Sequence, residues 1–85
     1  MAPVSFSLEG EVALVTGAGS GIGKAIAQAI AAGGASVGLV DLTRQANAET
    51  AEAISEAGGR CLSLAADVTQ LGQLRAAIDE TETAF

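Results

Sequence analysis

The sequence predicts an α/β protein in which helices pack on an open parallel sheet. Three short runs of aliphatic and β-branched residues, at 12–16, 36–40 and 61–66, are typical of buried strands. Each run is followed by a longer segment whose apolar residues recur at helical spacing. Such alternation is typical of parallel sheets, in which right-handed crossovers place successive strands side by side. We therefore expect three neighbouring strands in the order 3-2-1.

The first strand is expected at Val12–Thr16, where VALVT combines β-branched and aliphatic residues. The first helix should run from Gly21 to about Ala32, with Gly33 and Gly34 behind it as a stop signal. Apolar residues at helical spacing indicate this helix: Ile22, Ala25, Ile26, Ala29 and Ile30.

The second strand, SVGLV, is expected from Ser36 to Val40 and ends at Asp41. A helix should follow from about Gln45 to Ala57, with its glutamates facing water. The inward stripe of this helix is expected to comprise Ala46, Thr50, Ala53, Ile54 and Ala57.

The third strand, CLSLAA, covers Cys61–Ala66 and is followed by Asp67. We expect Cys61 to be a small buried hydrophobe rather than a reactive thiol. A third helix should open near Thr69, which is expected to be its N-cap. The stripe that we expect this helix to contribute to the core comprises Leu71, Leu74, Ile78, Thr81 and Phe85.

Length and composition exclude several classes of protein. The 85 residues correspond to at most one domain, and their net charge of -6 argues against a nucleic-acid partner. No apolar run reaches the about 18 residues of a membrane span, and the N-terminus lacks the features of a signal peptide. The chain has no His and only one Cys, so we assign no metal site and no disulfide. We expect a cytoplasmic protein without a membrane partner.

A glycine-rich loop, with four glycines between positions 17 and 23, joins the first strand to the first helix. Backbone N–H groups at a helix start have no partner within the helix, and the helix dipole adds partial positive charge. A phosphate binds well at such a junction, and glycine lets the backbone approach it closely. Ligands of open parallel sheets lie at the carboxyl ends of the strands, so this loop, Asp41 and Asp67 form one candidate site.

Each of these features also has a purely structural interpretation. The loop could be a tight turn without a ligand, although a strand before it and a helix after it favour ligand binding. Asp41 could cap the next helix, but it follows Gly23 by 18 residues, near the spacing of about 20 for a ribose-binding carboxylate. For Asp67, a capping role and a ligand role are both open. We interpret Lys24 as a solvated helix residue.

The glycine pattern differs from two common phosphate-binding motifs. G-x-G-x-x-G is absent in every frame. The P-loop is excluded because Ala18 stands where its first glycine is needed, and Ala25 where its Ser or Thr is needed. Phosphoryl transfer is therefore not expected. The pattern that fits is T-G-x-x-x-G-x-G, which begins at Thr16.

This pattern resembles TGxxxGIG, the N-terminal signature of the short-chain dehydrogenase/reductase family, and the lead-in LEGEVALVTGAGSGIGKAIA is similar to that of the family. The resemblance covers the chain from about Phe6 onward and implies a Rossmann-like fold. It also implies a pyrophosphate-binding loop in which glycines and their neighbours contact the cofactor: Gly17, Ser20, Gly21, Ile22 and Gly23.

The resemblance implies roles at the next two strand ends as well. Asp41 matches the acidic residue that binds the adenosine ribose hydroxyls, and Asp67 with Val68 matches the pair that lies against the adenine ring. A carboxylate accepts hydrogen bonds from both ribose hydroxyls and repels a 2′-phosphate, so NAD is favoured over NADP. Arg44 could reach a 2′-phosphate, whereas Ser20 stands where NADP-preferring relatives often carry a basic residue.

Members of this family run to about 250 residues and catalyse NAD(P)-dependent hydride transfer between a secondary alcohol and a carbonyl. Their catalysis depends on a Y-x-x-x-K motif and an N-N-A-G turn, which this chain lacks; it contains no Tyr. We therefore expect residues 1–85 to be the cofactor-binding part of a Rossmann domain, inactive by itself and without catalytic residues. The full-length enzyme would take a small alcohol or carbonyl substrate and form a homo-oligomer. The alternative is a non-catalytic nucleotide-binding module.

Overall fold

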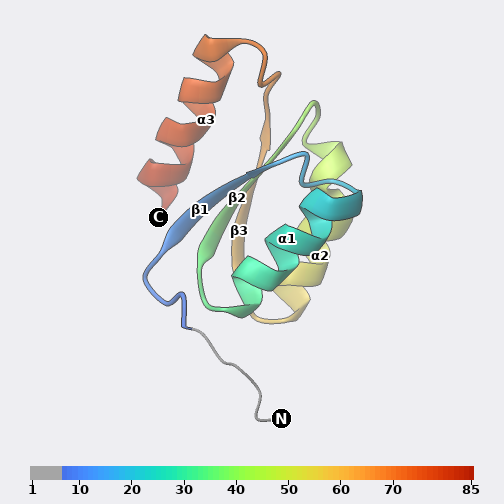
Figure 1. Ribbon diagram of the computed structural model, residues 1–85, viewed down its shortest axis with the longest axis vertical. Coiled ribbons are helices and arrows are strands. Elements are labelled where there is room, and N and C mark those ends of the chain that lie inside the picture. Colours follow the sequence, from blue (N-terminus) through green and yellow to red (C-terminus); the bar gives the residue numbers. More distant parts are fainter. Residues whose placement is uncertain (1–6) are drawn as a thin grey trace.

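The computed structural model describes residues 7–85, so Phe6 and the rest of the N-terminal stretch 1–6 lie outside the described residues. Within that range, strands and helices alternate as predicted (Figure 1). The strands are β1 (Val12–Thr16), β2 (Ser36–Asp41) and β3 (Arg60–Ala65). The helices are α1 (Gly21–Ala32), α2 (Ala48–Glu56) and α3 (Leu71–Ala84), and a 3-10 turn, η1 (Gln45–Asn47), leads into α2.

The central strand of the sheet is β2, which pairs in parallel with β1 on one side and β3 on the other. Thr16 lies opposite Val40, and Asp41 lies opposite Ala65. The order β1-β2-β3 is the predicted order 3-2-1 read from the other edge of the sheet. From Ser36 to Val40 the central strand is buried, because strands flank it and helices cover both its faces.

Helices cover the two faces of this sheet unequally. The pair α1 and α2 lies on one face and α3 lies on the other (Figure 1). The core on the side of α1 and α2 comprises Val15, Ala18, Ala27, Ala31, Val37, Leu39 and Ile54. The core on the side of α3 comprises Val40, Leu64, Ala66 and Ala77. The fold is therefore a three-layer α/β arrangement.

The apolar spacing predicted α1 correctly but did not indicate which of its sides is buried. The helix buries Ala27 and Ala31, whereas Ile22 is 80% exposed and Ile26 is 46% exposed. Small side chains let the helix lie close to the sheet. Ile22 and Ile26 lie on the outer side of the helix, whereas Ile30 packs against the core. The sequence therefore located the helix, and packing against the sheet set its rotation.

For α2, the inward stripe was predicted in part. Thr50 and Ile54 are buried as expected, and the glutamates of the helix are exposed. Ala46 and Ala57 are exposed, and Ala53 is half-buried, so the stripe is narrower than predicted. Both ends of the predicted helix lie outside α2, because its first turn is the 3-10 turn η1 and α2 ends at Glu56.

For α3, the predicted N-cap is wrong and the predicted core stripe is correct only in part. The helix begins at Leu71 with Gln70 as its N-cap, so Thr69 is not the cap. Its buried residues are Ala77 and Thr81 and its half-buried residue is Leu74, whereas the other predicted core residues are exposed: Leu71 at 62%, Ile78 at 37% and Phe85 at 39%. Thr81 lies directly over Gly38 of β2, where a Cβ atom would overlap it, and this close approach determines the side that α3 buries. Within residues 7–85, no helix has both the length and the apolar character needed to cross a membrane.

Candidate functional site

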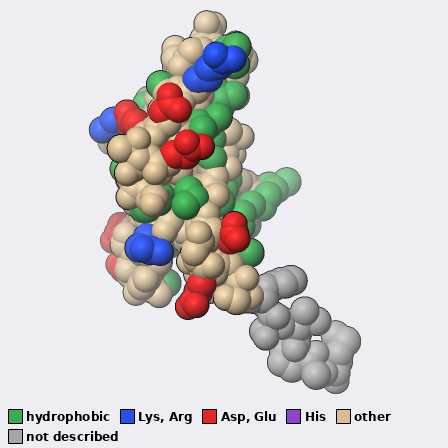
Figure 2. All heavy atoms as spheres, turned by 90° about the vertical axis from the view of Figure 1, so that its left-hand side faces the viewer, with side chains coloured by type: hydrophobic (Ala, Val, Ile, Leu, Met, Phe, Trp, Pro, Cys, Tyr) green, Lys and Arg blue, Asp and Glu red, His purple; other side chains and the backbone are tan. Residues whose placement is uncertain are grey.

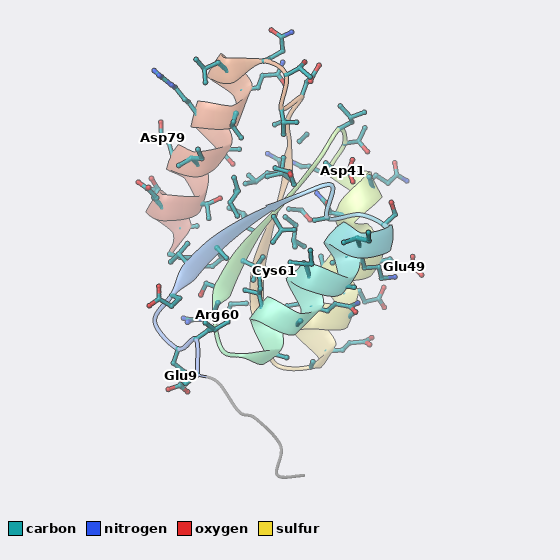
Figure 3. All side chains as sticks on the ribbon, in the orientation of Figure 1. Glu9, Asp41, Glu49, Arg60, Cys61 and Asp79 are labelled. Carbon is teal, nitrogen blue, oxygen red and sulfur yellow. The ribbon has the colours of Figure 1, made fainter. Side chains whose placement is uncertain are left out.

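The candidate site lies at the carboxyl ends of the three strands, where parallel pairing brings separate loops together. Asp41 pairs with Ala65, and its backbone carbonyl accepts a hydrogen bond from the amide of Ala66 (2.9 Å). The end of β3, and with it Asp67, therefore lies beside the end of β2. Figure 3 shows Asp41 next to the loop that enters α1, whereas Arg60 lies at the opposite end of the sheet. The fold therefore brings the glycine loop, Asp41 and Asp67 to one edge, as the sequence predicted.

The loop between β1 and α1 needs glycine for two different reasons. Gly17 and Gly21 have φ values of 64° and 58°, in the left-handed region that favours glycine. At both positions the space where a Cβ atom would point is open for at least 4 Å. At Gly23, by contrast, a Cβ atom would overlap the carbonyl of Gly17. The loop thus folds tightly back on the first turn of α1 and leaves its outer side open.

The first turn of α1 presents its backbone N–H groups without a capping side chain. Ser20 is the N-cap, with extended backbone angles of -158° and 163°, and its side chain makes no capping hydrogen bond. The first turn contains no acidic residue. An anion at this position would therefore meet free amide donors and the positive end of the helix dipole.

The carboxylate of Asp41 is held against this loop by two backbone donors. The amide of Leu42 donates to Oδ1 at 2.8 Å, and the amide of Gly19 donates to Oδ2 at 3.1 Å. Each oxygen retains a further lone pair, since an ionised carboxylate offers about four acceptor positions. The side chain is half-buried, so it can still accept hydrogen bonds from a ligand.

Buried polar side chains of η1 and α2 also support the loop, and the sequence did not point to this role. The hydroxyl of Thr50 donates to the carbonyl of Ala18 at 2.8 Å, and the amide of Ala18 donates to the carbonyl of Val40 at 3.1 Å. Thr50 was expected to be buried, and a buried hydroxyl needs a partner, but its partner lies 32 positions away. No local pattern reveals a contact of that kind.

Asn47 is a second buried residue that sequence reasoning missed. Its Nδ2 atom donates to the carbonyls of Leu39 and Leu64, at 3.0 and 3.2 Å, and thus bridges β2 and β3. Its Oδ1 atom is buried and has no hydrogen-bond partner among the described residues. This amide fixes the start of α2 beneath the strand that carries Asp41.

At the third strand end, Asp67 has a clear local role. Its Oδ1 atom accepts hydrogen bonds from the hydroxyl and the amide of Thr69, at 2.6 and 3.0 Å. These bonds, the one from the hydroxyl first, lower the pKa of Asp67. Its amide donates to Oε1 of Gln73 at 2.8 Å, while the neighbouring Val68 is 46% exposed. The turn before α3 is therefore well defined, and contact with an adenine ring remains a prediction.

Two further features of α1 and α2 do not belong to the site. Lys24 forms a salt bridge with Glu49, 3.5 Å between Nζ and Oε2, in agreement with a surface role (Figure 3 labels Glu49). A cavity of about 270 Å³ lies between the C-terminal halves of α1 and α2, away from the glycine loop. Ala31, Ala53 and Ile54 are among the residues that line it.

Comparison with known proteins identifies the family. Residues 11–85 match the sequence model of the short chain dehydrogenases. The chain belongs to this family. Its members are oxidoreductases with a Rossmann-type nucleotide-binding fold, and membership implies a nicotinamide dinucleotide as cofactor.

Several relatives resemble this chain over most of its length. It is 46% identical over 84 residues to a D-threitol dehydrogenase of Mycolicibacterium smegmatis, a match that covers 94% of this chain and 31% of the relative. It is 44% identical over 79 residues to an uncharacterized oxidoreductase of Methylorubrum extorquens, covering 92% and 32%. The chain thus spans about a third of the length of the curated relatives it matches.

Solved structures show the same similarity in three dimensions. A dehydrogenase/reductase from Sinorhizobium meliloti 1021 superimposes with a TM-score of 0.89 at 38% identity, over 94% of this chain and 32% of that one. A hydroxysteroid dehydrogenase from Escherichia coli superimposes with a TM-score of 0.88 at 36% identity, over 92% and 33%. The three-layer arrangement is therefore that of the N-terminal third of these enzymes.

Proposed function

We propose that these residues bind the ADP-ribose half of NAD and form the cofactor-binding part of an NAD-dependent oxidoreductase. The observation that carries this proposal is the position of the Asp41 carboxylate, which is hydrogen-bonded to the open glycine loop at the start of α1. An anion-binding helix start and a hydrogen-bond acceptor for sugar hydroxyls thus lie side by side.

The loop fits a pyrophosphate. Open space beside Gly17 and Gly21 leaves room for phosphate oxygens, and the uncapped first turn of α1 supplies N–H donors. Ser20 contributes a free hydroxyl and Ile22 a backbone amide to the same surface. Gly23 keeps α1 close to the loop, since any side chain there would overlap Gly17.

Asp41 would favour a ribose without a 2′-phosphate. Its two oxygens can accept hydrogen bonds from the two ribose hydroxyls of NAD, whereas a 2′-phosphate would meet a like charge. Arg44 is exposed three residues further on and offers a weaker, solvated counter-charge. Asp67 and Val68, which follow the adjacent strand, would lie against the adenine. We propose NAD rather than NADP on this balance.

The proposed enzyme moves hydride between a secondary alcohol and a carbonyl. The nicotinamide ring supplies the hydride acceptor or donor, and the residues described here bind and orient the adenosine end of the cofactor. We assign none of them a catalytic role. In the gene, this proposal predicts a Y-x-x-x-K motif downstream of Phe85, whereas a genuine stop codon with a stable product would favour a non-catalytic nucleotide-binding module.

Calorimetric titration of the chain with NAD, NADP and ADP-ribose tests the proposal. We expect NAD and ADP-ribose to bind with similar affinity and NADP to bind more weakly. Gly23→Ala should weaken binding of all three by about ten-fold or more, because the loop must open to admit the methyl group. Gly72→Ala, in open space on α3, is the matched control and should bind like the wild type. Tighter binding of NADP, or no binding of ADP-ribose, would contradict the proposal.

A further inference from the structure

We propose that Gly19 is a positioning residue for cofactor choice: it holds the Asp41 carboxylate at the angle at which it accepts NAD and rejects NADP. This inference rests on the proposed function and adds to it. Neither the sequence pattern nor the predicted site residues distinguished Gly19, which stands at a variable position of the T-G-x-x-x-G-x-G signature.

The carboxylate of Asp41 is held from both sides. The amide of Gly19 reaches Oδ2 from the loop, across 22 positions of sequence, and the amide of Leu42 reaches Oδ1 from the strand end. Two donors on two different oxygens restrict rotation of the carboxylate about its χ2 angle, because any rotation lengthens at least one bond. The loop amide is therefore the contact that couples the phosphate-binding loop to the sugar-binding side chain.

The requirement for glycine at position 19 comes from space and not from backbone angles. Gly17 and Gly21 have positive φ values and open surroundings, whereas Gly19 has no positive φ. A Cβ atom at Gly19 would overlap the carbonyl oxygen of Ala46 and would lie 2.8 Å from Oδ2 of Asp41. Any side chain at position 19 would therefore separate the loop from the segment 41–46, which runs from Asp41 to Ala46.

That segment cannot easily move away. The amide of Ala46 is bonded to the hydroxyl of Thr43 at 3.1 Å, which fixes the turn into η1. Directly after it, Asn47 and Thr50 are fully buried and hydrogen-bonded to the sheet and to the loop. A methyl group at position 19 would overlap the backbone of Ala46 and crowd Oδ2 of Asp41, so the glycine loop itself must move away. That movement breaks the hydrogen bond from the Gly19 amide and releases the Asp41 carboxylate on that side.

Holding the Asp41 carboxylate in place should affect the choice between NAD and NADP more than the affinity for either cofactor. Discrimination between two cofactors is a difference between two binding free energies. If the charge of Asp41 alone rejected NADP, any carboxylate near this position would suffice. If the held geometry matters, a displaced carboxylate loses hydrogen bonds to the NAD ribose and moves away from the 2′-phosphate, so the ratio of the NADP and NAD dissociation constants falls.

The experiment measures this ratio for the wild-type chain, Gly19→Ala and Asp41→Glu, with ADP-ribose as the probe for the loop. Asp41→Glu keeps the charge but places the carboxylate one methylene further out. We expect both variants to lower the ratio by about ten-fold, the effect of losing one hydrogen bond to a charged group. Hydrogen exchange of the Gly19 amide should also be faster in Asp41→Glu.

Two glycine controls separate this role from a loss of stability. Gly38→Ala introduces a methyl group that would lie 2.9 Å from Cδ1 of Leu14 and overlap Thr81, so it should lower stability without changing the ratio. Gly72→Ala, in open space, should change neither. A readout that is a ratio of two affinities is insensitive to the fraction of unfolded chain.

The outcomes distinguish this inference from the proposed function. A wild-type chain that binds neither NAD nor ADP-ribose overturns both. A wild-type chain that prefers NAD, together with a folded Gly19→Ala variant of unchanged ratio, overturns only the role of Gly19. If Gly19→Ala does not fold, the Asp41→Glu variant tests the inference instead. If that variant keeps the wild-type ratio of dissociation constants and the wild-type exchange rate of the Gly19 amide, the inference is rejected.

Discussion

The two faces of the sheet are closed by different kinds of contact. Under α1 and α2, buried polar side chains reach across elements: Thr50 bonds to the glycine loop, and Asn47 bonds to β2 and β3. Under α3, the buried Thr81 bonds only to the carbonyl of Ala77 in its own helix, at 2.8 Å. The face with long-range polar bonds is the one that supports the candidate site, so the shape of the loop depends on α2 as well as on its own glycines.

A single helix, α3, covers this second face of the sheet. Leu71, Ile78 and Phe85 are exposed there, and Figure 2 shows acidic, basic and hydrophobic side chains interspersed on this face. The helix contacts the sheet mainly through small residues, as its close approach at Gly38 shows. We therefore expect matched substitutions on the two faces to have unequal effects, and the following predictions test that difference.

The largest effect on the free energy of unfolding is expected for Asn47→Asp, on the side of α1 and α2. The new carboxylate would be buried opposite two carbonyl oxygens, so the free energy of unfolding should fall by about 3–5 kcal/mol at neutral pH. Burial raises the pKa of such a group above its unfolded value, so the loss should diminish as the pH falls and the protonated acid regains a donor. Urea unfolding followed by far-UV circular dichroism at several pH values measures this, since the chain has neither Trp nor Tyr as a fluorescent probe.

The corresponding amide-to-acid change on the side of α3 is Gln70→Glu, at the exposed N-cap of that helix. A negative charge at a helix start interacts favourably with the dipole, so stability should stay within about 0.5 kcal/mol of the wild type. Similar losses in the two variants would show that the two regions do not differ as proposed.

An intermediate effect is expected from a pair of threonines. Thr50→Val leaves the carbonyl of Ala18 without its donor in a buried site, and should cost about 1–3 kcal/mol. Thr81→Val removes a bond to a carbonyl that the helix backbone already uses, and should change stability by about 0.5 kcal/mol or less. Chemical denaturation of both variants provides the measurement, and equal costs would contradict the comparison.

The two threonine variants should also differ in their affinity for ADP-ribose. Because its hydroxyl is bonded to the loop, Thr50→Val should also weaken ADP-ribose binding, whereas Thr81→Val should not. Thr50→Ser, which keeps the hydroxyl, should restore most of the affinity. Failure of serine to do so would assign the loss to packing instead of the hydrogen bond.

The smallest effect concerns Asp67 before α3. Hydrogen bonds from Thr69 lower its pKa, so the stability they contribute is fully present at neutral pH and is lost as the pH falls below the ordinary value of about 3.9. Thr69→Ala should return the pKa of Asp67 part of the way toward that value and reduce this acid-dependent contribution, because the backbone amide at position 69 still donates to Asp67. NMR titration of the Asp67 carboxyl carbon provides the readout, and an unchanged pKa in the variant would rule out the proposed cause.

Local patterns in the sequence were sufficient to predict the elements and the position of the candidate site. The strands and helices begin and end within about three residues of their predicted limits, since aliphatic runs and glycine stops indicate them directly. The glycine loop and Asp41 meet as expected, because parallel strands present their carboxyl ends at the same edge. The core residues of α3 were predicted less accurately. Apolar spacing does not reveal that the missing side chain at Gly38 lets Thr81 approach the sheet closely.

By itself, then, the sequence determined the order of the elements and the edge at which the glycine loop and Asp41 meet, because periodicity and chain connectivity act locally. Only the tertiary structure decided which helix sides are buried and that Gly19 and Thr50 hold the site together. Those contacts join residues 22 and 32 positions apart, and such pairs become neighbours only when the helices have packed on the sheet.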